Sequence, residues 1–119
     1  MKPAHVFGIP NCDSVRRARQ WLDGREIPYE FHDFRKEGLD TVQLAAWIGQ
    51  VGWETLLNRR GTTWRQLPAE QRDGVDAQRA QVLMLAQPTL VKRPVLQTGQ
   101  HLEVGFDADR YATLFKGCP

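Results

Sequence analysis

The first third of the chain alternates between two hydrophobic periods, and this alternation restricts the fold more than any other feature. Residues 4–8 have the pattern of a short apolar strand, and residues 14–23 place apolar side chains at helical spacing. Residues 27–34 then have the alternation of a second strand. Two strands joined by so short a helical crossover favour parallel pairing and a right-handed connection. The start of the chain therefore predicts a β-α-β unit.

The middle of the chain, residues 36–87, predicts a helical insertion. Asp40 or Thr41 is expected to cap one of its helices, Asp76 to start another, and Pro88 to end the last one. The whole chain has 119 residues, which suffices for one hydrophobic core and is short for two. We therefore expect a single domain over residues 1–119 with this insertion inside it.

The last third of the chain predicts two more strands and a helix. Residues 95–96 and 101–106 have strand patterns on either side of Thr98-Gly99, a plausible hairpin turn. Asp107 is placed to cap a final helix. The order β-α-β, helical insertion, β-β-α predicts an α/β fold with one mixed sheet of about four strands.

Composition excludes several classes of protein. Sixteen basic and fourteen acidic side chains give a net charge of +2, so no general affinity for nucleic acid is expected. The longest apolar run, residues 82–86, is far too short to cross a membrane, and the start of the chain lacks the pattern of a secretory signal. We expect a cytoplasmic protein. The two cysteines form no disulfide framework, and the spacing of Cys and His predicts no metal site.

Cys12 is the main candidate for chemistry, because it lies between the first strand and the first helix. The N–H groups and the dipole at a helix start stabilise negative charge, and a stabilised thiolate is a nucleophile. Asp13 or Ser14 is expected to cap this helix. A C-x-x-C dithiol is excluded because position 15 is Val15, and a C-x5-R phosphatase loop is excluded because position 18 is Ala18. Cys12 must therefore act alone or with a more distant thiol.

Arginine is the second chemical signal, since the chain has twelve Arg and four Lys. The guanidinium group binds oxyanions and carboxylates through paired donors. Arg93 precedes Pro94, which holds it in extended backbone at the start of a strand. Arg59 and Arg60 precede the polar loop that begins with Gly61.

Three separated motifs give the sequence a family resemblance. They are residues 8–13 (GIPNCD), residues 56–65 (LLNRRGTTWR), and residues 92–94 (KRP) followed by residues 104–107 (VGFD). Together they resemble the arsenate reductase (ArsC) family, in the branch that contains Spx-type regulators and YffB-like proteins, over nearly the whole chain. The resemblance implies a thioredoxin-like fold with a helical insertion.

The resemblance also assigns residues to a site. It implies a nucleophilic cysteine at Cys12, an oxyanion-binding arginine at Arg93 and a cis proline at Pro94. Arsenate reductases of the family use three arginines; the second aligns near Asn58, beside Arg59 and Arg60, and the third falls at residues 102–103, which are Leu and Glu here. The sequence therefore favours a thiol reductase over a dedicated arsenate reductase.

The resulting hypothesis is a glutathione-dependent thiol reductase without a tightly bound cofactor. Cys12 is its nucleophile, and Asn11, Arg60, Arg93 and Pro94 bind the substrate anion or glutathione. Cys118, the penultimate residue, is expected to be dispensable. The alternatives are a weak arsenate reductase and an Spx-like regulator that binds RNA polymerase. The hypothesis of an Spx-like regulator depends on Gly52. This residue matches the glycine through which those regulators contact RNA polymerase, but it is also explained as the end of a helix.

Overall fold

The computed structural model describes residues 4–99 and 101–115. The chain divides into two compact units. The first combines the residues up to Asp33 with those from Arg93 onward, and the second is Phe34–Lys92. Within the described residues no helix is both long enough and apolar enough to cross a membrane.

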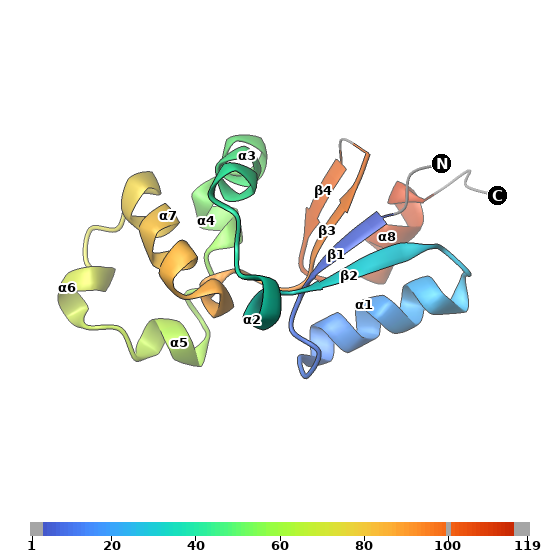
Figure 1. Cartoon of the computed structure of the whole chain (residues 1–119), viewed down its shortest axis with the longest axis horizontal. Helices are drawn as coiled ribbons and strands as arrows, with labels where there is room; N and C mark the ends of the chain where they lie inside the picture. The colour runs from blue at the N-terminus through green and yellow to red at the C-terminus, as the bar shows by residue number, and fades with distance from the viewer. Residues whose placement is uncertain (1–3, 100, 116–119) are drawn as a thin grey trace. The chain divides into compact units, whose positions relative to one another are not determined.

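The first unit is built on a four-stranded mixed sheet. Its strands are β1 (Ala4–Gly8), β2 (Tyr29–Asp33), β3 (Val95–Thr98) and β4 (His101–Val104), in the order β2-β1-β3-β4 (Figure 1). β1 is parallel to β2 and antiparallel to β3, which is antiparallel to β4. The predicted α/β class and four-stranded mixed sheet are confirmed.

Two helices of the first unit share a core with this sheet. They are α1 (Asp13–Gly24) and α8 (Ala108–Leu114). Apolar side chains from both helices and from β1 and β3 form one buried cluster: Ala4, Val6, Ala18, Leu22, Leu96 and Tyr111. Because successive strand residues point to opposite faces, His5 and Phe7 lie on the face of β1 opposite Ala4 and Val6.

The second unit consists of short helices. They are α2 (Phe34–Glu37), α3 (Thr41–Val51), α4 (Trp53–Leu56), α5 (Thr62–Arg65), α6 (Ala69–Arg72), α7 (Ala77–Ala86) and the 3₁₀ helix η1 (Pro88–Leu90). Buried side chains from several of them form its core: Leu44, Trp47, Leu56, Met84 and Leu90. An antiparallel bridge between Leu57 and Val91 joins the segment after α4 to the segment after η1.

Helix caps account for most of the agreement between the expected and observed elements. Asp40, Asp76 and Asp107 each accept a hydrogen bond from the N–H three residues on, at 2.9, 2.9 and 3.0 Å. The second strand is shorter than expected and begins at Tyr29. The turn before it contains Glu26 with a positive φ, and Pro28 has no N–H for the ladder.

Candidate active site

Cys12 is the N-cap residue of α1, in the segment that follows β1. Its backbone is extended (φ −104°, ψ 130°), and its carbonyl accepts the first helical hydrogen bond from the Arg16 N–H at 2.9 Å. The side chain is half-buried. The expectation that Asp13 or Ser14 caps the helix is wrong, because both residues are already inside it.

The position of Cys12 places its sulfur beside the start of a helix. The first turn of a helix has N–H groups without helical partners, and the helix dipole is positive at this end. In the described part of the chain, the Cys12 side chain makes no capping hydrogen bond. The sulfur is therefore not committed to the helix end.

The charges on the first turn of α1 largely compensate each other. Arg16 donates to the carboxylate of Asp13, one turn before it, and both side chains are exposed. Asn11, the residue before Cys12, is exposed in the turn that leads into the helix. Arg16 therefore adds little positive field at the sulfur, and a positive group for an anion must come from elsewhere in the fold.

Gly8 determines how closely α1 approaches the end of β1. A Cβ placed on Gly8 would lie 2.7 Å from Cγ2 of Val15, a side chain that is fully buried on α1. Only glycine permits this contact between the last residue of the strand and the first turn of the helix. The sequence analysis did not identify this role, although a glycine just before the cysteine turn is a signal for close backbone packing.

Arg93 and Pro94 lie at the same end of the sheet as the Cys12 turn. β3 is antiparallel to β1 with Val95 opposite Phe7, so the residues before Val95 lie next to the end of β1. A Cβ on Gly8 would also lie 3.8 Å from Cβ of Arg93. Sequence positions more than eighty residues apart thus meet beside the turn that carries Cys12.

The Arg93-Pro94 peptide bond is cis, as the resemblance implied. Pro94 is buried, and its carbonyl accepts a hydrogen bond from the Gly105 N–H at 2.8 Å. Arg93 itself is half-buried. The first unit therefore brings together four of the five predicted site residues: Asn11, Cys12, Arg93 and Pro94.

Arg60, the fifth predicted residue, belongs to the second unit. It is exposed in a turn that the Asn58 side chain holds: the Asn58 carbonyl oxygen accepts the Arg60 N–H at 3.1 Å. A Cβ on Gly61 would lie 2.8 Å from the Asn58 amide nitrogen, so a side chain at position 61 would displace the Asn58 amide that holds this turn. Arg59 is directed to Glu54 at 3.8 Å and lies over the Trp53 ring. Arg60 is therefore the better of the two adjacent arginines for an external anion.

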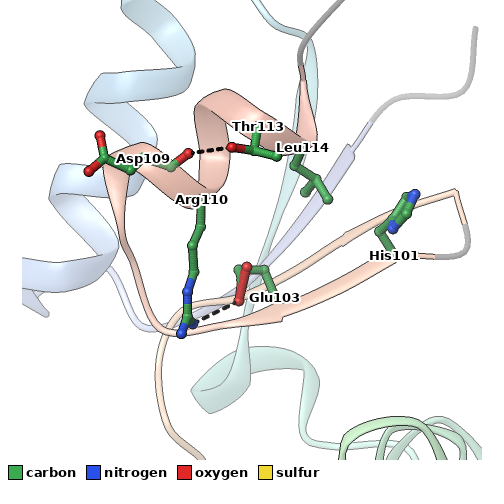
Figure 2. Close-up of a pocket in the computed structure, with 6 residues that line it drawn as sticks. All are labelled: His101, Glu103, Asp109, Arg110, Thr113 and Leu114. Carbon is green, nitrogen blue, oxygen red and sulfur yellow. Dashed lines mark hydrogen bonds and ion pairs between the residues drawn. The ribbon is translucent and has the colours of Figure 1, made fainter.

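A separate pocket of about 550 Å³ lies between β4 and α8 (Figure 2). Its lining residues are His101, Glu103, Asp109, Arg110, Thr113 and Leu114. Figure 2 shows Arg110 reaching from α8 to Glu103, with Nη1 3.2 Å from the carboxylate. The pocket contains none of the predicted site residues. Glu103, one of the two residues in the region where the resemblance places the third arginine, thus has its charge compensated from α8.

The comparison with known proteins identifies the family. Residues 7–114 match the model of the ArsC family. This chain belongs to the ArsC family.

Solved structures of ArsC-related proteins resemble this chain over almost its full length. An arsenate reductase (ArsC) related protein from Brucella melitensis is 50% identical, with 97% of this chain and 96% of that chain covered and a TM-score of 0.77. The protein YFFB is 44% identical, with coverage of 92% and 96% and a TM-score of 0.90. The fold of this chain is thus the α/β fold of these ArsC-related proteins.

Regulators are also among the relatives. The global transcriptional regulator Spx of Listeria innocua is 28% identical over 106 residues, which are 87% of this chain and 80% of the regulator. The proteins similar to this chain therefore include both an arsenate reductase (ArsC) related protein and a transcriptional regulator.

Proposed function

We propose that this ArsC-family protein is a glutathione-dependent thiol reductase with Cys12 as its single nucleophile. The observation that carries the proposal is the position of half-buried Cys12 at the N-cap of α1, at the sheet end where Arg93 and cis-Pro94 precede β3. Such a position stabilises the thiolate, and an arginine beside it offers a binding site for an anion.

The chemistry consists of two thiol-disulfide exchanges. The Cys12 thiolate attacks the glutathione sulfur of a mixed disulfide between substrate and glutathione. The S–S bond of that disulfide breaks, and the substrate leaves as a thiolate, which then takes up a proton. Cys12 is then joined to glutathione. A second glutathione thiolate attacks that glutathione sulfur and releases Cys12 as thiolate. The substrate gains two electrons and glutathione disulfide is the oxidised product.

The neighbouring residues bind the anionic groups of the substrate. Arg93 pairs with a carboxylate of glutathione or with an oxyanion, through two parallel hydrogen bonds. The backbone at Pro94 accepts the extended peptide of glutathione beside the sulfur, and Asn11 contributes a polar side chain from the turn. Arg60 belongs to the second unit and is proposed by itself as an anion-binding residue, exposed in the turn that Asn58 holds.

Turnover of a substrate panel tests the proposal. Glutathione-mixed disulfides, arsenate and dehydroascorbate are each supplied with glutathione, and the product thiol or glutathione disulfide is followed. We expect turnover of at least one mixed disulfide, complete loss in Cys12→Ser, and wild-type rates in Cys118→Ser. Cys118 lies outside the described residues. Activity that survives in Cys12→Ser, or that fails on every substrate, would contradict the proposal.

The relationship to Spx regulators requires a second measurement. Gly52 ends α3 with φ +87°, and a Cβ there would meet nothing within 4 Å. Its backbone conformation alone explains the glycine. Binding to the C-terminal domain of the RNA polymerase α-subunit is measured for the wild type and for Gly52→Arg, with melting temperatures as the folding control. Tight, Gly52-dependent binding without thiol turnover would contradict the reductase proposal and favour a regulator that binds RNA polymerase.

A further inference from the structure

We propose that His5, Glu30 and His32 form a binding site for a divalent transition-metal ion, with Zn²⁺ as the preferred ion. The three side chains come from the two parallel strands β1 and β2. One ligand atom from each lies within 4.8 Å of the others. The sequence analysis predicted no metal site, because the two histidines are 27 residues apart and only the strand pairing brings them together.

The strand register explains why these three residues meet. His5 pairs with Glu30, and Phe7 pairs with His32, so all four residues share one face of the sheet. His5 Nδ1 is 2.9 Å from His32 Nε2 and 3.3 Å from the Glu30 carboxylate. Ligand atoms bound at about 2.0–2.1 Å in a tetrahedral site are separated by about 3.3 Å. Two of the three separations are therefore close to those around a coordinated ion, and the third, between His32 and Glu30, is at most 4.8 Å.

The chemistry of the donor set suits a borderline metal. Two imidazoles and one carboxylate are the protein ligands of many zinc sites that keep a fourth position for water. The two imidazoles now share one proton in a hydrogen bond. For both nitrogens to bind the metal, the donating ring must take its other tautomer, with the proton on its second nitrogen. Both histidines then bind as neutral ligands, and the carboxylate lowers the charge of the ion.

The surroundings make the group rigid on one side and accessible on the other. The Phe7 ring stacks on His32, with centroids 4.5 Å apart and planes 14° apart, and Phe7 is buried. The side chains of His5 and Glu30 are 37% and 62% exposed, so an ion can enter from solvent. Ligands on paired strands need little rearrangement to bind.

Zinc titration by calorimetry tests the site. The full-length protein without an affinity tag is used in a Cys12→Ser, Cys118→Ser background, so that thiols do not bind the metal. We expect one Zn²⁺ per chain. His5→Gln and His32→Gln should weaken binding at least about tenfold, as expected for removal of a ligand. His101→Gln, which changes the third histidine of the chain, is the matched control and should bind within about twofold of its background.

Further readouts keep the test decisive if a histidine variant is unstable. Glu30 is exposed, so Glu30→Gln should fold and bind Zn²⁺ more weakly, whereas exposed Glu70→Gln should not change the affinity. Co²⁺ in place of Zn²⁺ should give the visible d–d bands of a low-coordinate site, lost in His5→Gln. Absence of stoichiometric binding, or equal affinity in His5→Gln, Glu30→Gln and their controls, would overturn the proposal and leave the group as a hydrogen-bonded cluster only.

Discussion

Arg93 is the residue whose substitution distinguishes most directly among substrate classes. Its guanidinium can hold a carboxylate or oxyanion through two hydrogen bonds, and each charged hydrogen bond is worth roughly 1.5–3 kcal/mol. Arg93→Ala should therefore lower kcat/KM on the physiological substrate about ten- to a hundredfold. Arg93→Lys keeps the charge without the paired geometry and should recover only part of the loss. Steady-state kinetics on the three proteins measures both effects.

A matched control, Arg17→Ala, distinguishes a specific contact of Arg93 with the substrate from a general effect of positive charge near Cys12. Arg17 is exposed on the first turns of α1, close in sequence to Cys12, and should have little effect when changed to Ala. Melting temperatures of all variants test whether each is folded. Wild-type kcat/KM in Arg93→Ala, or an equal loss in Arg17→Ala, would remove Arg93 from the substrate site.

Single residues also show where sequence reasoning is strong. Cys12 was identified because a lone cysteine between a strand and a helix has a clear chemical meaning. Its capping position was not predicted, because Asp13 and Ser14 are better capping residues by type. The role of Gly8 depends on the distance between a strand and a helix, a quantity that a sequence does not contain.

At the scale of elements, the contact between β1 and α1 positions Cys12, the proposed nucleophile. Gly8→Ala would place a methyl group 2.7 Å from Cγ2 of buried Val15, so the helix start must shift or Val15 must move. Overpacking of this kind costs about 1–3 kcal/mol of unfolding free energy. We expect Gly8→Ala to unfold at lower urea concentration and to lose turnover beyond the loss of folded protein, because Cys12 moves with the helix start.

A second substitution tests the physical cause. Val15→Ala removes the two methyl carbons of Val15 and makes room for the new group, while it creates a small cavity of its own. The double variant Gly8→Ala, Val15→Ala should therefore be less destabilised than the sum of the two single variants. Additive losses would show that the effect of Gly8→Ala does not come from the Val15 contact.

The elements themselves were predictable wherever local chemistry determines them. The capping aspartates Asp40, Asp76 and Asp107 each begin a helix as expected, because their carboxylates accept a nearby N–H. The helical middle of the chain was predicted only in outline. There α6 was not recognised, since four residues without a buried side chain give no periodic signal.

At the scale of the whole molecule, two strand pairings of the sheet were predictable, but the strand order and the register were not. The β-α-β start predicts parallel pairing of β1 and β2, and a short turn predicts the β3–β4 hairpin. The pairing of His5 with Glu30 requires knowing which residue of one strand lies opposite which residue of the other. Spacing rules for metal ligands act within one segment, so a site formed across two strands escapes them.

A buried tyrosine in the core of the first unit, Tyr111, should make the protein less stable at alkaline pH. Tyr111 is fully buried in that core, and its hydroxyl has no hydrogen-bond partner among the described residues. Burial, and next the negative charge of Glu103, raise the pKa of Tyr111 above its ordinary value of about 10. The folded protein therefore keeps the proton at a pH where the unfolded chain loses it.

The sign of the effect follows from proton linkage. A pKa raised in the folded state contributes stability that is complete below about pH 10, the unfolded value, and is lost as the pH rises toward the folded value. The variant Tyr111→Phe has no phenol to titrate, so this loss of stability at alkaline pH should be absent.

At neutral pH, Tyr111→Phe removes a buried hydroxyl without a hydrogen-bond partner among the described residues. The variant should therefore be as stable as the wild type or up to about 1 kcal/mol more stable. Between about pH 9 and about pH 11, the free energy of unfolding of Tyr111→Phe should rise relative to that of the wild type by about 1 kcal/mol. Urea unfolding of both proteins at each pH, with the two cysteines changed to serine, measures the difference; a constant difference would mean that the Tyr111 hydroxyl reaches solvent in the folded state.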